Sequence, residues 1–94
     1  MSTKDLSTYV PIFDRTNYKE WYDKLEAFAM AMKCNGPMTK DQPADAAALA
    51  AFNIIDRQMR GMIRLRLGAT YQSHVKATAK LTLAALKTAF GTPG

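Results

Sequence analysis

The stretch from Phe13 to Met32, FDRTNYKEWYDKLEAFAMAM, contains the only Trp of the chain, two of its four Tyr and two of its four Phe. Its apolar residues recur every three or four positions, which is the period of an α-helix. They are Tyr18, Trp21, Tyr22, Leu25, Phe28, Ala29 and Met32. Asn17, followed three residues later by Glu20, predicts a capping box. Because aromatic side chains bury large apolar areas, we expect a helix over residues 18–33 to be the centre of the fold.

Two further stretches have helical patterns. The first follows Pro43, is rich in Ala and has either Asp41 or Gln42 as its expected N-cap. Its apolar stripe consists of Ala48, Phe52, Ile55, Met59, Met62 and Ile63. Arg66 would lie on that apolar face, so we predict a break near Gly61 and a short separate helix over residues 62–67. The last helix is expected over residues 75–90.

These patterns predict an all-α protein, a compact bundle of four to five helices. We expect a flexible N-terminal arm over residues 1–11, a helical domain over residues 12–90 and the start of a linker over residues 91–94. Val10, Ile12 and Phe13 are expected to anchor the arm on the first helix. The predicted core consists of Phe13, Tyr18, Trp21, Leu25, Phe28, Phe52, Ile55, Leu83, Leu86 and Phe90.

Charge is distributed unevenly along the chain, whose net charge is +5. Residues 1–56 contain all eight acidic residues, whereas residues 57–94 contain seven basic residues and no acidic one. This asymmetry favours an anionic partner such as RNA, bound through its phosphates without sequence specificity. The candidate residues are Arg57, Arg60, Arg64, Arg66, Lys76 and Lys80. No aromatic residue is interleaved with these bases, so a platform for nucleobase stacking is not indicated. A solvated basic surface explains the pattern nearly as well.

No pattern typical of an enzyme occurs in the sequence. Cys34 and His74 are single residues of their types and are far apart, and neither a Gly-rich phosphate loop nor a metal-ligand spacing is present. We therefore expect no catalytic residue, cofactor, metal ion or small-molecule substrate. The chain contains no long apolar run and no apolar leader, so we expect no membrane association. A single Cys favours a reducing, intracellular and cytoplasmic setting.

Some apolar residues fall outside the helical stripes. The outer face of the first helix becomes apolar near its C-terminal end, and one Leu of the last helix lies opposite its stripe. These self-association candidates are Ala27, Met30, Ala31 and Leu81. Scattered apolar surface residues, which are common in proteins, are the alternative interpretation.

The first stretch resembles the N-terminal Gag signature of copia-type LTR retrotransposons, in which a Phe precedes Asn-Tyr and a Trp follows after two variable residues. The matching residues are Phe13, Asn17, Tyr18 and Trp21. The similarity continues over about residues 11–90, through Ile54-Ile55, Met62-Ile63, Thr78-Ala79, Leu83, Leu86 and Phe90. The Gly that usually precedes Asn-Tyr is absent and Leu83 replaces a second Trp, which indicates a diverged or domesticated copy.

This resemblance implies a capsid-like Gag domain, similar to the N-terminal lobe of retroviral capsids, that associates with itself into a shell, or virus-like particle, around RNA. It covers the N-terminal lobe alone, as expected for a segment of a longer Gag or for a stand-alone protein. Two other functions stay open from the sequence. One is a monomeric helical adaptor that binds a partner peptide or helix. The other is a small nucleic-acid-binding domain.

Overall fold

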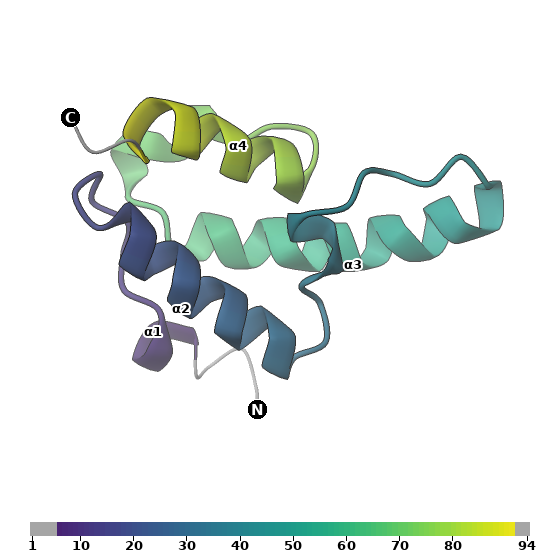
Figure 1. Cartoon of the computed structure of the whole chain (residues 1–94), viewed down its shortest axis with the longest axis horizontal. Helices are drawn as coiled ribbons and strands as arrows, with labels where there is room; N and C mark the ends of the chain where they lie inside the picture. The colour runs from purple at the N-terminus through teal and green to yellow at the C-terminus, as the bar shows by residue number, and fades with distance from the viewer. Residues whose placement is uncertain (1–5, 92–94) are drawn as a thin grey trace.

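The computed structural model describes residues 6–91. They form the predicted all-α bundle, in which no strand occurs over that range. The elements are α1 (Leu6–Tyr9), α2 (Tyr18–Ala31), the 3-10 helix η2 (Gly36–Met38), α3 (Ala46–Leu65), the 3-10 helix η3 (Ala69–His74) and α4 (Ala79–Phe90). Figure 1 shows α3 between α2 and α4, with its N-terminal end projecting beyond both of them.

Most of the predicted core residues lie in the core. Those that are buried are Phe13, Trp21, Leu25, Phe28, Leu83 and Leu86. Tyr18 and Phe90 are partly buried and pack against this cluster. The stretch that begins at Phe13 is therefore the centre of the fold, as its helical period and aromatic content predicted.

The ring of Phe13 is the point where three segments meet. Its centroid lies 5.3 Å from Trp21, 5.1 Å from Tyr71 and 5.5 Å from Phe90. Trp21 Nε1 donates a 2.9 Å hydrogen bond to the carbonyl oxygen of Arg66, so the buried indole N–H has a partner. These contacts tie α2 to the chain that follows α3 and to the end of α4.

Asn17 precedes α2 as predicted, but it forms no capping box. Its Oδ1 accepts a hydrogen bond from the backbone N–H of Asp14, and its Nδ2 donates one to the carbonyl oxygen of Ile12. The expected partner, Glu20, forms an ion pair with Lys24 instead. The side chain of Asn17 therefore stabilises the turn before α2, which places Phe13 in the core, and does not cap the helix.

Residues 6–11 differ from the flexible arm expected over residues 1–11. They include α1, and both Leu6 and Val10 are buried, so this segment belongs to the folded domain. Two apolar side chains in one short segment gain enough burial to hold it against α2. Val10 and Phe13 are the predicted anchors, whereas Ile12 is exposed. Residues 1–5 of the arm and residues 92–94 of the expected linker lie outside the described residues.

The predicted break near Gly61 is wrong, because α3 is one uninterrupted helix. It ends at Leu65, and Arg66 occupies the C-cap position, where its Nε donates a 2.9 Å hydrogen bond to the carbonyl oxygen of Val10. The guanidinium of Arg66 therefore has a hydrogen-bond partner just past the end of the helix, and α3 does not need to break to accommodate this residue. Leu65 is simply left exposed.

Side-chain caps start both α3 and α4, at positions that differ from the prediction. Asp45 Oδ2 accepts a 2.9 Å hydrogen bond from the backbone N–H of Ala48, so both expected caps lie upstream of the helix. Thr78 Oγ1 accepts one from the backbone N–H of Leu81. The last helix consequently begins at Ala79, and residues 75–78 belong to the connection.

The two halves of α3 differ in burial. In the C-terminal half, residues 56–65, Met59, Met62 and Ile63 are buried. In the N-terminal half, residues 46–55, no residue is buried. Phe52 is only half-buried and stays outside the core cluster, and Ile55 is 37% exposed. Both were expected in the core, and both predictions are wrong because this half extends past α2 and α4 (Figure 1).

A buried carboxylate joins α3 to α4. Asp56 Oδ1 accepts a 2.9 Å hydrogen bond from the backbone N–H of Ala79, and Oδ2 accepts one of 2.8 Å from Arg60 Nε. The side chain of Asp56 is almost fully buried, so these two donors replace the water that the carboxylate loses. The position of α4 against α3 therefore depends on Asp56.

Candidate functional site

Three of the six basic candidates are available to a ligand. They are exposed, and their side chains form no ion pair within residues 6–91: Arg57, Arg64 and Lys76. Arg57 and Arg64 are two turns apart on α3, so they share one face of the helix. A phosphate backbone could bind along that face by charge alone.

The other three basic candidates already have partners. Arg60 is ion-paired with Asp56, and Lys80 Nζ lies 2.8 Å from a carboxylate oxygen of Asp41. Asp41 is largely exposed, so its pairing with Lys80 is weak and exchangeable. Arg66 is half-buried and its Nε donates a hydrogen bond to the carbonyl oxygen of Val10, so it is less available to a ligand than Arg57 or Arg64.

A polar hollow of about 470 Å³ lies beside the basic face of α3. Its lining includes Arg57 and Arg60, together with Gln42, Asn53 and Asp56. The carboxylate of Asp56 offsets the charge of Arg60, so Arg57 supplies the net positive charge of this hollow. The hollow can accept a polar or anionic group, but it holds no constellation of acid, base and nucleophile.

A second groove, of about 390 Å³, lies between α2 and α4 and places aromatic rings beside basic side chains. Tyr18 and Tyr22 line one side of it, and Lys80 and Lys87 line the other. Burial raises the pKa of Tyr18 to about 12 and also raises the pKa of Tyr22, so both phenols are neutral at physiological pH. Sequence spacing did not reveal this neighbourhood, because the rings and the bases come from different helices.

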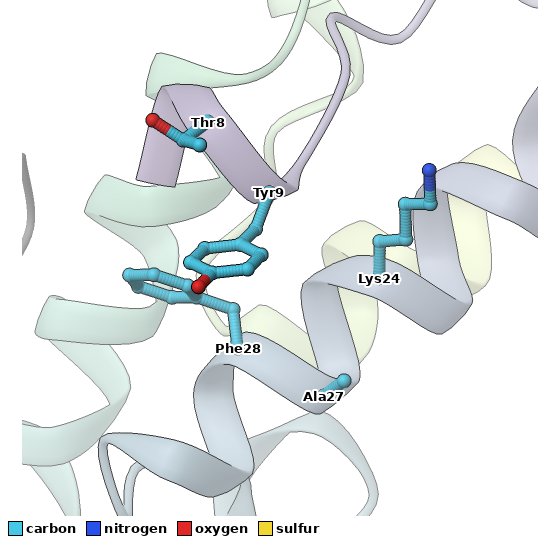
Figure 2. Close-up of a pocket in the computed structure, with 5 residues that line it drawn as sticks. All are labelled: Thr8, Tyr9, Lys24, Ala27 and Phe28. Atoms are coloured by element: carbon cyan, nitrogen blue, oxygen red, sulfur yellow. The ribbon is translucent and has the colours of Figure 1, made fainter. Parts of the chain in front are cut away.

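A third, mostly apolar groove of about 380 Å³ lies between α1 and α2. Figure 2 shows the rings of Tyr9 and Phe28 next to each other, with Ala27 and Lys24 further along α2. The two ring centroids are 6.2 Å apart, and Tyr9 is 55% exposed. Thr8 completes the lining. Such a groove suits an apolar side chain of a partner better than a charged ligand.

The four predicted self-association residues are all exposed, but only part of the set lies together. Ala27 lines the groove between α1 and α2, and Met30, which is 58% exposed, lies one turn further along the same face. Ala31 belongs to that face as well. Leu81 is 53% exposed in the first turn of α4 and does not line this groove.

The N-terminal half of α3 is an exposed apolar segment, although Phe52 and Ile55 within it were predicted to lie in the core. Residues 46–55, AAALAAFNII, contain no charged residue. Ile54 is 72% exposed, more than any other large apolar residue that the structure describes. The run of ten uncharged residues was visible in the sequence. Its residues Ala48, Phe52 and Ile55 continue the apolar stripe of the buried half, and periodicity cannot show where a neighbouring helix ends.

Cys34 and His74 have different surroundings in the structure. Cys34 is buried, its Sγ lies 3.7 Å from Met62 Sδ, and burial raises the pKa of its thiol. The ring of His74 packs on Phe90 with centroids 5.2 Å apart. Among residues 6–91, no group of three or more His, Cys, Asp or Glu side chains is placed to hold a metal ion. No helix in that range combines the length and apolar character that crossing a membrane requires.

Comparison with known proteins adds no assignment. No protein-family model, curated protein or solved structure matches the chain.

Proposed function

We propose that this chain is a structural, self-associating domain of a capsid-like Gag protein from a retrotransposon-like element, and that its assembly packages RNA in the cytoplasm. The observation that carries the proposal is the number of large apolar residues that stay exposed on a domain with a buried core. The exposed large apolar residues among those described are Tyr9, Ile12, Met30, Ile54, Ile55, Leu65 and Leu81. They lie on several helices, so one copy can contact several neighbours, as a closed assembly requires.

The resemblance to copia-type Gag supports the same function. Phe13 and Trp21 of the signature are in contact at the centre of the core, and Asn17 holds the turn between them. These residues of the signature therefore contribute to folding. A signature of this kind is expected in a protein whose function is to assemble into a larger structure.

RNA binding is the second part of the proposal. Arg57, Arg64 and Lys76 are exposed, and the chain carries a net charge of +5. Contacts of this kind are made to phosphates and are non-specific. Their affinity should therefore fall steeply as the salt concentration rises.

The test is the mass of the protein by light scattering over a concentration series, with and without a generic single-stranded RNA. We expect the mean mass to rise with concentration and to rise further with RNA at low salt. A monomer mass at every concentration, unchanged by RNA, would refute the proposal for this domain.

A monomeric adaptor is the second candidate, and the apolar groove between α1 and α2 favours it. In that function, Tyr9 and Phe28 would hold an apolar side chain of a partner helix or peptide. The same mass measurement separates the two candidates, because an adaptor stays monomeric. Tyr9→Ala would then weaken binding of the partner without changing the mass.

A further inference from the structure

The groove between α2 and α4 brings together two kinds of side chain that lie far apart in the sequence. Tyr18 and Tyr22 come from α2, whereas Lys80 and Lys87 come from α4. The two Tyr are four positions apart and the two Lys are seven, so each pair shares one face of its helix. The groove therefore has an aromatic wall and a basic wall, and this combination is typical of sites that bind single-stranded nucleic acids.

The aromatic wall is held in place by the core. The ring centroid of Tyr18 lies 6.4 Å from that of Phe13 and 6.3 Å from that of Trp21. The ring of Tyr22 lies 5.8 Å from Tyr18, and the two ring planes are inclined by 31°. Both Tyr are half-buried and line the groove, so each keeps part of its surface for a ligand. Rings that are already fixed lose little conformational freedom when a nucleobase stacks on them.

The electrostatics of the two walls differ. Over its whole length, α4 contains Lys80 and Lys87 and no acidic residue. On α2, burial and then the carboxylates of Glu26 and Asp23 raise the pKa of Tyr22, so its phenol is neutral but lies near negative charge. A phosphate is therefore attracted to the α4 wall and repelled from the α2 wall. This leaves the uncharged base of a nucleotide for the tyrosine rings.

Both lysines can reach a phosphate. Lys87 is exposed and forms no ion pair within residues 6–91. Lys80 pairs with Asp41, but the side chain of Asp41 is 84% exposed, so a phosphate can displace this weak pair. The two lysines are about 10 Å apart along the helix axis and can bind different phosphates of one strand. The groove volume of about 390 Å³ is near the lower end for small-ligand sites and suits a single base.

We propose that the groove between α2 and α4 binds single-stranded RNA, with one unpaired base stacked on Tyr22 and the flanking phosphates bound by Lys80 and Lys87. This inference rests on the proposed packaging of RNA and deepens it, because it adds a site that contacts a base to the phosphate contacts proposed above. Bases in a duplex are paired and stacked, so the site selects single strands. Stacking and charge together give little preference among bases.

The first test is the affinity for a short fluorescent oligouridylate, measured by anisotropy at low salt. Tyr22→Leu should weaken binding at least about fivefold, because the stacked base loses its aromatic partner. Tyr22→Phe keeps the ring and should bind like the wild type. Tyr9→Leu is the matched control, because Tyr9 is an exposed Tyr that lines a different groove, and it should not change the affinity. An unchanged circular dichroism spectrum shows that each variant is folded.

A second pair of variants tests the basic wall by a gain of affinity. Asp41→Asn and Glu20→Gln each remove the carboxylate of one exposed lysine ion pair, with equal changes in net charge. Only Asp41→Asn frees a lysine of this groove, so it should strengthen binding of the oligouridylate at least twofold more than Glu20→Gln does. Equal effects would mean that binding responds to net charge alone, which contradicts the proposed site.

An abasic strand of the same length separates stacking from charge. It carries the same phosphates, so it should compete with the oligouridylate at least about fivefold more weakly for the wild type but equally well for Tyr22→Leu. If the wild type binds RNA, but the abasic strand or an oligoglutamate competes equally well and Tyr22→Leu binds like Tyr9→Leu, the inference is wrong and the proposed function stands. If the wild type does not bind RNA at low salt, the inference and the RNA-binding part of the proposed function fail together. Self-association in the mass series would then stand by itself.

Discussion

The two halves of α3 are each ten residues long, but their surroundings differ. Residues 56–65 bury Met59, Met62 and Ile63 in the core, whereas residues 46–55 bury none of their side chains. The charged residues are distributed in the opposite way to what burial would suggest. The buried half carries three Arg and an Asp, and the exposed half carries no charge.

Under the proposed self-association, the apolar residues of α3 serve two purposes. The C-terminal half uses a narrow apolar stripe for folding, and its charged residues cover the remaining faces. The N-terminal half has apolar residues on faces that folding leaves in water, at a cost that burial in a partner would recover. Each of the following substitutions compares one half with the other.

The largest difference is expected between Ile63→Ala and Ile54→Ala. Ile63 is fully buried, so its truncation should lower the free energy of unfolding by about 2–5 kcal/mol. Ile54 is mostly exposed in the single chain, so the same change there should cost less than about 0.5 kcal/mol. Urea unfolding at low protein concentration measures both values. Similar losses would mean that the N-terminal half is packed after all.

Asp56 marks the boundary between the halves, and Asp56→Ala should be next in size. The change leaves the backbone N–H of Ala79 without its acceptor and Arg60 without its ion-pair partner, at a cost of about 1–3 kcal/mol. Asp56→Asn is the control, because its amide oxygen can still accept from Ala79 and should preserve part of this stability. If the Asn and Ala variants lose equal stability, the bond to Ala79 does not hold α4 in place.

The fold was predictable from the sequence to the extent that local patterns determine it. The helical period and aromatic content of residues 18–32 identified α2 and most of the core, and the all-α class followed. Features that depend on contacts between residues far apart in the sequence were not predictable. The position of Arg66 on the apolar face predicted a break in α3. In the structure, Arg66 instead donates a hydrogen bond to the carbonyl oxygen of Val10, 56 residues away in sequence. Asp56 was not identified because nothing in its neighbourhood shows that the start of α4 lies next to it.

In the candidate sites, too, local patterns predicted some features, whereas features that depend on packing between helices were not predicted. Exposure of Arg57, Met30 and Leu81 was expected from helix faces alone. Phe52 and Ile55 were assigned to the core, because a periodic stripe looks the same whether a neighbour covers it or not. The groove that combines Tyr22 with Lys87 depends on how α2 and α4 pack.

Asp45→Ala should have a smaller and more local effect. Loss of the N-cap acceptor for Ala48 is expected to cost about 1 kcal/mol. Because the N-terminal half of α3 has few tertiary contacts, that loss should appear as fraying of this half. Amide hydrogen exchange should accelerate in residues 46–52 and stay unchanged around Met59. Uniform acceleration along α3 would show that the helix opens as one unit.

The smallest effect on stability is expected for Arg57→Glu and Arg64→Glu in the buried half of α3. Both residues are exposed on the same face of the helix, so neither substitution should change the free energy of unfolding by more than about 0.5 kcal/mol. Both substitutions change the charge equally, so both should weaken RNA binding to a similar extent, and the loss should shrink as salt is added. Binding of a generic single-stranded RNA at low and at high salt measures this, and a variant that binds RNA like the wild type would remove that residue from the proposed RNA-binding surface.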